Sequence, residues 1–438
     1  MELGRGSTIG RFLLYKRDWN QAAFVNHIPG DTMLRIKAFK ALRPAGELAG
    51  QVASAPYDVV NRAEAAELAK GNPNSFLHVS RPEIDLPADL DPYSQAVYDK
   101  AREAFKRLQD NGALIREPKP CLYLYRQRMG NHVQRGLVAC CHTGDYESGI
   151  IKRHELTRKD KEDDRTRHIS AIQAQPGPVF LTYRDSAKID SMVKKAEAGT
   201  PLYDFKASDG VAHTVWRIAE PGPFEAAFRE IPVSYIADGH HRAASAARIA
   251  RERRADRASD DEAQWFLAVL FPATQLKILP YNRLVKDLNG LRADAFMAEI
   301  GRRFTMVRNA PPQPTQPRNI SVFMNGEWKG LSWADEPGAD PVSVLDVSVL
   351  QNRLLAPVLG IDDPRTSKRI DFVGGIRGTA ELEARVRSGE CAVAFSMYPT
   401  TVDQLMAIAD AGLIMPPKST WFEPKLKSGL LIHTIEPA

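Results

Sequence analysis

The stretch YIADGHHRAASAARIARERR, residues 235–254, decides the architecture expected for this chain. Its apolar start has the character of a short strand that ends at Asp238, and Gly239 supplies a turn. The alanine-rich remainder, from Arg242 to Arg254, predicts a helix. A strand that passes directly into a helix indicates a protein in which helices pack against a sheet.

This junction of strand and helix is also the sharpest candidate for a ligand site. Backbone N–H groups at the start of a helix have no partner within the helix and stabilise an anion. Gly239 allows a ligand to approach the backbone closely. His240, His241 and Arg242 add donors, and Asp238 is placed either to cap the helix or to hold a metal ion beside a phosphate. The simpler alternative is a plain helix cap with exposed histidines.

A second polar segment, GIIKRHELTRKDKEDDRTRHISA, spans residues 149–171. Thr157 and Asp160 have N-cap spacing, which predicts a helix that begins near Arg158 and leaves Glu155 at the end of a strand. Four basic residues then share one helix face: Arg158, Lys161, Arg165 and His168. A solvated, salt-bridged helix is the alternative. Four of the ten histidines lie in these two segments, so we expect the segments to share one polar site.

The whole chain indicates a folded protein of mixed architecture. It has 438 residues, of which 43% are apolar and 26% charged, as in ordinary globular proteins. Strands and helices mix irregularly, so the expected fold class is α+β (mixed α/β). We also expect a brief strand at residues 76–79 and a linker at residues 142–149. Composition breaks, including a proline-rich connector at 311–317, divide the chain into an N-terminal extension at 1–32, an N-terminal α/β region at 33–139, a central core at 140–310 and a C-terminal α/β region at 318–438.

Several function classes are disfavoured. A net charge of +5 is too small to indicate nucleic-acid binding. The most apolar stretch, residues 265–273, is far shorter than the about 20 residues of a membrane span. Four cysteines without a CxxC pair predict neither a zinc site nor a disulfide scaffold, so a cytoplasmic location is expected. The sequence contains no P-loop, protein-kinase or Rossmann motif.

Three further polar clusters are weaker, because each is also typical of a turn or a surface loop. They are Tyr57 and Asp58 in APYDVV, Asn74, His78 and Arg81 in NSFLHVSRPE, and Lys418, Ser419, Thr420 and Lys425 in PPKSTWFEPK.

The parts present suit phosphoryl transfer, which depends mainly on positioning and charge neutralisation. The reaction needs N–H groups and cations around a phosphate, a metal-binding carboxylate, and a base near the acceptor hydroxyl. Asp238 and the GHHR turn supply the first two, and Glu155 is a candidate base.

Eight segments taken together resemble one family: APYDVV, NSFLHVSRPEIDL, RGLVA, IIKRHELT, the KEDDRTRHI helix, YIADGHHR, ILPYNRLVKDL and MPPKSTWFEPKLKSG. In this order they are similar to the bacterial domain of unknown function 1015, over about residues 33–430. That family is related in its central part to free serine kinases of the SerK type and to the ParB/sulfiredoxin fold. The resemblance implies a ParB/sulfiredoxin-like core, with a nucleotide held near DGHHR.

The resemblance also implies a reaction. Glu155 matches the glutamate that acts as base toward the serine hydroxyl, and Asp238, Gly239 and His240 match the phosphate-binding turn. The function implied is Mg²⁺-dependent phosphorylation of free L-serine, or of a similar small hydroxy compound, to O-phosphoserine. ATP, ADP and pyrophosphate stay open as phosphate donors.

The expected site residues fall into four groups. They are Glu155, Asp238 and His240 for catalysis; Gly239, His241, Arg242, Arg165 and His168 for the nucleotide; His154, Arg153, Asn74 and His78 for the substrate; and Asp238 for Mg²⁺. The expected partners are a nucleotide and a small serine-like substrate, without membrane or nucleic acid, and a homodimer stays open.

Two other functions stay open. A ParB-like nucleotide-binding regulator or DNA-binding switch is suggested by an arginine-rich helix end, although acidic residues follow at once and no helix-turn-helix is evident. The arginines are Arg248, Arg251, Arg253, Arg254 and Arg257. A non-catalytic scaffold is the other function, and it would bind no nucleotide.

Overall fold

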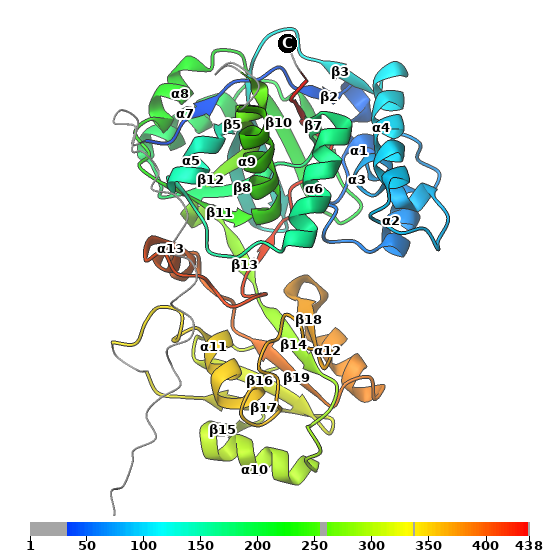
Figure 1. Cartoon of the computed structure of the whole chain (residues 1–438). Helices are drawn as coiled ribbons and strands as arrows, with labels where there is room; N and C mark the ends of the chain where they lie inside the picture. Colours follow the sequence, from blue (N-terminus) through cyan, green and yellow to red (C-terminus); the bar gives the residue numbers. More distant parts are fainter. Residues whose placement is uncertain (1–32, 255–260, 336–337, 437–438) are drawn as a thin grey trace, which may run out of the picture. The chain divides into compact units, whose positions relative to one another are not determined.

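The structure is a computed structural model that describes residues 33–254, 261–335 and 338–436. Its largest element is a nine-stranded mixed sheet (Figure 1). The strands follow the order β6 (Ile151–Lys152), β11 (Ser234–Asp238), β8 (Val179–Tyr183), β12 (Trp265–Pro272), β5 (His132–His142), β4 (Leu122–Met129), β10 (Ala212–Ile218) and β9 (Tyr203–Lys206), and β1 (Ile36–Lys37) also pairs with β5. Only β6 with β11 and β8 with β12 pair in parallel within this sheet.

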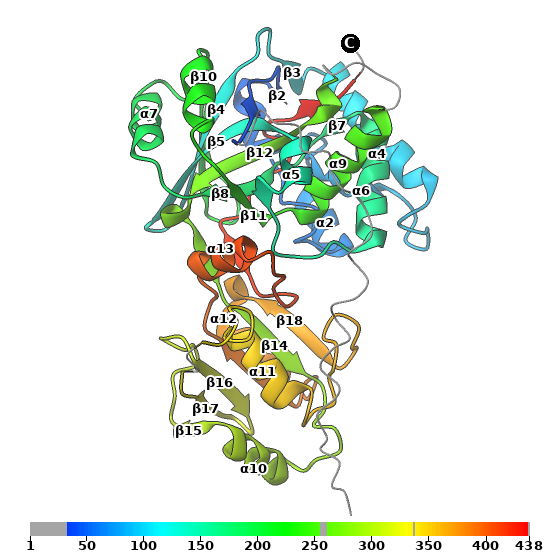
Figure 2. The ribbon, with the colours of Figure 1, turned by 60° about the vertical axis from the view of Figure 1, so that its left-hand side comes forward.

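Helices cover one face of this sheet because its strands alternate apolar side chains between two faces. On one face, Leu124, Leu137 and Leu270 pack against helices α7, α8 and α9. The central helix α9 presents buried alanines to β8 and β12, and these small side chains let the helix lie close to the sheet (Figure 2). The helices on or beside this face are α5 (Thr143–Ser148), α6 (Lys159–Ile172), α7 (Ala187–Glu197), α8 (Gly222–Phe228) and α9 (His240–Arg254).

The N-terminal helices pack beside α6. Helix α4 turns Val97, Ala101 and Phe105 inward, and the Tyr98 hydroxyl donates to Asp164 of α6 at 2.9 Å. These elements are α1 (Ala49–Val52), α2 (Arg62–Ala69), α3 (Leu77–Ser80), α4 (Gln95–Asp110) and the strand pair β2 (Leu42–Pro44) with β3 (Leu114–Arg116).

A second, six-stranded sheet follows β12 along the chain. Its strand order is β15 (Thr305–Arg308), β17 (Glu327–Ser332), β16 (Asn319–Met324), β19 (Val393–Met397), β14 (Tyr281–Val285) and β18 (Ile370–Gly374). Strands β16 and β17 form a hairpin with its turn at Asn325-Gly326, a residue pair typical of two-residue hairpin turns. The helices of this part are α10 (Ala293–Arg303), α11 (Asp346–Leu350), α12 (Gly378–Arg387) and α13 (Val402–Asp410).

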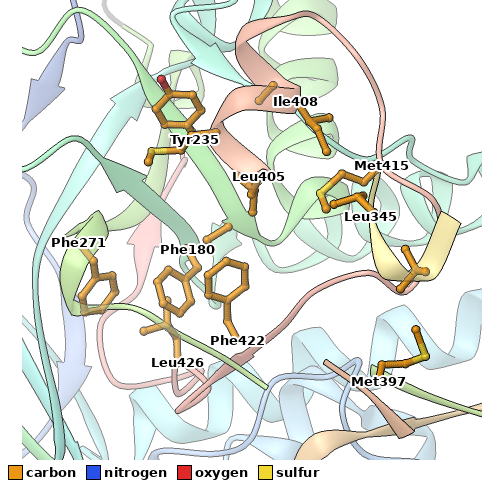
Figure 3. Close-up of a cluster of buried hydrophobic side chains, with 14 of the residues drawn as sticks. Phe180, Tyr235, Phe271, Leu345, Met397, Leu405, Ile408, Met415, Phe422 and Leu426 are labelled. Atoms are coloured by element: carbon orange, nitrogen blue, oxygen red, sulfur yellow. The ribbon is translucent and has the colours of Figure 1, made fainter. Parts of the chain in front are cut away.

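The C-terminal segment returns to the large sheet. Strand β20 (Trp421–Glu423) pairs with β13 (Lys277–Leu279), and β21 (His433–Thr434) pairs with β7 (Ala174–Gln175). Figure 3 shows Phe180, Tyr235 and Phe271 of the large sheet in one buried cluster with residues from α13 and the segment after it. The large sheet and the C-terminal part therefore share a hydrophobic core.

The fold class expected from the sequence, α+β (mixed α/β), is confirmed. Two local expectations are wrong. Residues 76–79 enter the one-turn helix α3 rather than a strand, with Phe76 and Val79 both buried at helical spacing. The expected linker at 142–149 contains helix α5. A short apolar or polar run does not by itself distinguish these states.

One strand crosses an expected domain limit, and one sheet contains strands from both sides of another. Strand β5 runs through residue 140, and the proline-rich segment at 311–317 joins β15 and β16 of one sheet. The chain passes from the large sheet to the small one between β12 and β14. The four-part division stays a prediction, and the extension at 1–32 lies outside the described residues. Among the helices of the described ranges, none has the length and apolar character to cross a bilayer.

Candidate functional site

Strand β11 ends at Asp238 and helix α9 begins at His240, so Gly239 alone makes the turn between them. Its φ of +98° lies in the region that side chains disfavour, and a Cβ there would come within 3.0 Å of the Arg242 guanidinium. The predicted strand, turn and helix are thus present, and the helix starts two residues earlier than the range predicted from its alanines.

Asp238, Arg242 and Lys425 form one group, called here the charge-paired cluster. The Lys425 ammonium donates to Asp238 Oδ2 at 3.0 Å, and an Arg242 guanidinium nitrogen lies 3.7 Å from Oδ1. Burial alone would raise the pKa of Asp238, but Lys425 and Arg242 hold it well below its usual range. The same carboxylate raises the pKa of Lys425 against the effect of burial. The Asp238 carboxylate and the Lys425 ammonium therefore both stay charged.

Lys425 reaches this position because of the C-terminal pairing. Strand β20 aligns Glu423 with Lys277 of β13, which places Lys425 two residues beyond the ladder. The Gln127 side chain of β4 donates to the Lys425 carbonyl at 2.8 Å and holds the backbone there. The Lys425 ammonium also lies 4.7 Å from the Trp421 ring centroid.

His154, Glu155 and His240 form a second group, called here the histidine cluster. The His154 and His240 rings meet edge to face with centroids 4.5 Å apart, and His240 Nδ1 lies 3.8 Å from Glu155 Oε2. Burial lowers the pKa of His154 to about 4, and burial followed by the neighbouring His154 lowers the pKa of His240. Both rings are therefore neutral near pH 7.

Glu155 faces the interior of a cleft. Its side chain is 41% exposed and lines the cleft together with Lys418 and Asp238. Partial burial raises the pKa of its carboxyl, Lys418 opposes the rise, and Asp238 adds to it. A carboxylate with a raised pKa at the edge of a cleft is suited to accept a proton near neutral pH.

The start of α6 completes one wall of the cleft. The Arg158 backbone N–H donates to His241 Nε2 at 3.0 Å, which joins the beginnings of α6 and α9. The predicted Thr157 cap is wrong, because Arg158 occupies the N-cap position and the Thr157 hydroxyl donates to Glu162 instead. Burial lowers the pKa of His241, so this ring accepts as a neutral imidazole.

Arg165 and His168 lie deeper on the same helix. Arg165 pairs with Asp164 at 2.7 Å and stacks on the Tyr57 ring, 4.0 Å from its centroid. His168 Nε2 lies 2.8 Å from the Val79 carbonyl, and burial lowers the pKa of its ring to about 4. The expected basic face thus contains a neutral histidine and an internally paired arginine.

Most of these residues line one cleft of about 860 Å³. This volume is within the about 300–1,000 Å³ of typical small-molecule sites. Its walls come from the N-terminal helices, the β11–α9 junction and the C-terminal segment. Among the predicted residues, the lining includes Glu155, Arg165, His168, Asp238, Gly239, His240, His241 and Arg242. The sequence therefore identified segments that the fold brings together.

Four residues expected to bind substrate do not line this cleft. His154 lies buried behind His240. Arg153 lies over the Tyr146 ring, and Asn74 donates to Gln51. His78 lies 2.8 Å from Asp85, to which it is tied in the N-terminal layer. Their substrate-binding role stays a prediction.

The cleft is also lined by residues from the polar clusters that gave weaker signals in the sequence. Asp58 lies on its rim and has no ion pair among the residues that the structure describes. Lys418 and Lys425 both line it, and the Lys418 loop is held by a hydrogen bond from Arg283 to the Lys418 carbonyl at 3.1 Å. The motifs APYDVV and PPKSTWFEPK carried this signal, but a turn or loop explained each motif equally well.

Two expectations for ligands can be compared with these contacts. The cations Arg242, Lys418 and Lys425 beside the start of α9 fit a phosphorylated ligand. Asp238 faces cations with both oxygens, which fits a carboxylate that orients them better than one that ligates Mg²⁺. Its metal role stays a prediction.

The arginine-rich end of α9 pairs largely within the chain. Arg248 pairs with Asp163 and Glu252, and Arg254 pairs with Glu147. Arg251 also reaches Glu147, Arg253 donates to the Ile435 carbonyl, and Arg257 lies outside the described residues. These pairs leave little of the positive charge that DNA binding requires.

A family model described as "Protein of unknown function (DUF1015)" matches residues 36–348. The chain belongs to this family. The resemblance seen in the sequence is thereby confirmed at the level of the family. In this DUF1015 chain, the segment MPPKSTWFEPKLKSG with Lys418 and Lys425 lies beyond the matched residues.

Solved structures similar to this DUF1015 chain are distant. A conserved hypothetical protein from Pyrococcus furiosus is 12% identical, over 64% of this chain and 90% of that chain, with a TM-score of 0.33. SbnI with a C-terminal truncation, from Staphylococcus aureus, is 11% identical over 67% and 86%, with a TM-score of 0.36. A free serine kinase in complex with AMP is 10% identical over 67% and 91%, with a TM-score of 0.36. The ParB/sulfiredoxin-like core stays a prediction, and no curated protein matches the chain.

Proposed function

We propose that this protein is a nucleotide-dependent phosphotransferase that phosphorylates the hydroxyl of a small molecule, with free L-serine as the leading substrate. One observation carries the proposal. A proton-accepting carboxylate, Glu155, and a phosphate-binding arrangement of Lys425, Arg242 and the start of α9 line the same cleft. Phosphoryl transfer requires little more from a protein than these two elements in register.

Charge supports the phosphate side of the proposal. Asp238 pairs with both Lys425 and Arg242 and raises the pKa of Lys425, and Lys418 is a third basic residue on the cleft wall. Phosphate oxygens are stabilised by such cations and by the N–H groups at a helix start. In this proposal Asp238 orients the cations rather than binding the substrate.

Glu155 supplies the acceptor side. Its raised pKa lets it take the proton of the substrate hydroxyl as that oxygen attacks the terminal phosphorus. The new bond is between the substrate oxygen and phosphorus, and the bond to the bridging oxygen of the donor breaks. The nucleotide leaves with one phosphate fewer, and Glu155 returns its proton to solvent.

The divalent cation and the phosphate donor of this reaction are proposed from the sequence. Phosphoryl transfer ordinarily uses a divalent cation to neutralise phosphate charge. Mg²⁺ is the expected ion, with ATP or ADP as the nucleotide.

The proposal is tested by incubating the full chain with L-serine, a divalent cation, and ATP, ADP or pyrophosphate in turn. Phosphorus NMR should show O-phosphoserine with at least one donor. Glu155→Gln should abolish most of this signal. Glu103→Gln, on the exposed face of helix α4, is the matched control and should retain it. The proposal fails if no donor gives a phosphorylated product with serine or other small hydroxy compounds, or if Glu155→Gln keeps full activity.

A further inference from the structure

The histidine cluster contains an arrangement that the proposed reaction does not use. His154, Glu155 and His240 each direct one potential ligand atom to a common point, and these atoms all lie within 4.8 Å of one another. Two come from adjacent residues of the short segment after β6, and the third comes from the first residue of α9. The fold therefore brings together two groups from a loop and one from a helix start.

The two histidines are deeply buried, and most of their ring nitrogens make no hydrogen bond. His154 is 2% exposed and His240 is 5% exposed. Within the described part of the chain, three ring nitrogens make no hydrogen bond of ordinary geometry: Nδ1 and Nε2 of His154, and Nε2 of His240. The Ile236 carbonyl is near enough to favour a proton on the His154 ring. Buried polar atoms are nearly always satisfied in native proteins, so a pair of unsatisfied imidazoles side by side needs an explanation.

A metal ion that binds one nitrogen of His154 and Nδ1 of His240 supplies that explanation for His154 and leaves Nε2 of His240 outside it. We propose that His154, Glu155 and His240 bind a divalent first-row transition metal ion, such as Mn²⁺, Co²⁺ or Zn²⁺. Two imidazole nitrogens and one carboxylate oxygen form a set that these ions prefer, whereas Mg²⁺ prefers oxygen ligands alone. Three protein ligands are the number found at sites that keep a position open for water or substrate.

The geometry is close to what such an ion requires. Neighbouring ligand atoms in a tetrahedral site are about 3.3 Å apart, given metal–ligand bonds of about 2.0–2.1 Å. His240 Nδ1 and Glu155 Oε2 are 3.8 Å apart. Glu155 is the half-exposed member, so its side chain has more freedom to move toward an ion than the two buried rings have. Its exposed side leads into the cleft, where the open position of the metal would face.

The site shares Glu155 with the proposed phosphotransferase, but its existence does not depend on that function. A carboxylate that binds a metal through one oxygen keeps the other oxygen for the substrate proton. If both proposals hold, turnover with Mn²⁺ or Co²⁺ should exceed turnover with Mg²⁺. Direct metal binding, measured without nucleotide or substrate, tests the site on its own.

The binding experiment uses the full chain without a histidine tag, stripped with a chelator. Calorimetric titration with Co²⁺ or Zn²⁺ should give one ion per chain, and Mg²⁺ at the same concentrations should not compete. Glu155→Gln, His154→Gln and His240→Gln should each weaken binding at least about tenfold, because even groups that only orient metal ligands contribute about 10–100-fold. His132→Gln, at the far end of the β4–β5 hairpin, is the matched control and should bind as the wild type does.

A second measurement avoids dependence on the variants' folding. X-ray absorption at the zinc edge of the loaded wild-type chain should show two imidazole nitrogens and carboxylate oxygen in the ligand shell. An ion with oxygen ligands alone, a stoichiometry well below one, or unchanged binding by folded His240→Gln would overturn the site. Serine phosphorylation with Mg²⁺ and no transition-metal binding would also overturn it while leaving the proposed function intact. Metal binding without any phosphotransfer would leave the site and remove the function.

Discussion

The two clusters meet at the β11–α9 junction, where Asp238 of one and His240 of the other are two residues apart, but their side chains differ in charge. In the charge-paired cluster, Asp238 and Lys425 are half-buried and hydrogen-bonded to each other, so both keep their charges. In the histidine cluster, His154 and His240 are buried without such partners, so both rings are neutral. The first cluster is complete without a ligand. The second becomes complete only when something occupies the space between its three groups.

The largest expected effect separates catalysis from binding. Glu155→Gln keeps the size of the side chain but removes the proton acceptor. We expect kcat for phosphoryl transfer to fall by about 10²–10⁴, the usual contribution of a general base, while nucleotide affinity changes little. Steady-state kinetics and calorimetric nucleotide binding measure the two quantities. A loss confined to nucleotide affinity would place Glu155 on the phosphate side instead.

Lys425→Met should damage the charge-paired cluster in two ways. It removes a phosphate-binding cation, so nucleotide affinity should fall about 10–100-fold. It also leaves Asp238 without its nearest partner. Breaking a fully buried pair costs about 3–5 kcal/mol. Because Lys425 is 17% exposed, we expect about 2–4 kcal/mol here, measured by urea unfolding.

The double variant Asp238→Asn with Lys425→Met separates these two causes. Removal of both charges should recover part of the lost stability, because the Asp238 carboxylate is no longer left without Lys425, although Arg242 loses its anionic partner; it should not recover nucleotide affinity. Full recovery of affinity would show that Lys425 only supports the fold.

Acid should destabilise the chain through its buried neutral histidines. The pKa values of His154 and His168 fall from 6.5 to about 4 on folding, so the unfolded chain binds more protons between these values. The free energy of unfolding should therefore decrease as pH falls from 6.5 to 4, by about 2–3 kcal/mol per ring. Thermal unfolding of chelator-treated protein measures this. His154→Gln should reduce the slope in that window, and an unchanged slope would contradict the assigned burial.

The smallest expected effect tests the coupling between Lys418 and Glu155. Lys418 holds the pKa of Glu155 below the value that burial alone would produce. Lys418→Met should therefore raise that pKa and move the acid limb of the pH–rate profile to higher pH. An acid limb that moves to lower pH, or does not move, would show that Glu155 is not the group that titrates.

Local sequence patterns predicted the elements better than their assembly. The strand before Gly239, the turn at Gly239 and the alanine-rich helix after it follow from local patterns, and the structure has all three. The two-sheet arrangement depends on long-range pairing. In particular, β20 joins β13 across more than a hundred residues of chain, and no local pattern specifies such a partner.

The site shows the same division. Glu155 and the DGHHR turn stood out because several chemically active residues occur at the end of a strand or the start of a helix. Lys425 did not, because its importance comes from an ion pair with a residue far away in sequence. The unsatisfied nitrogens of His154 and His240 were likewise hidden, since burial and missing partners are properties of the folded chain alone.

The most direct test of the account is a crystal structure of the full chain with ADP bound. The account predicts that the phosphates lie at the start of α9, within hydrogen-bond distance of Lys425, and that Glu155 faces the remaining space of the cleft. Phosphates bound elsewhere on the chain, with the β11–α9 junction free of ligand, would contradict it.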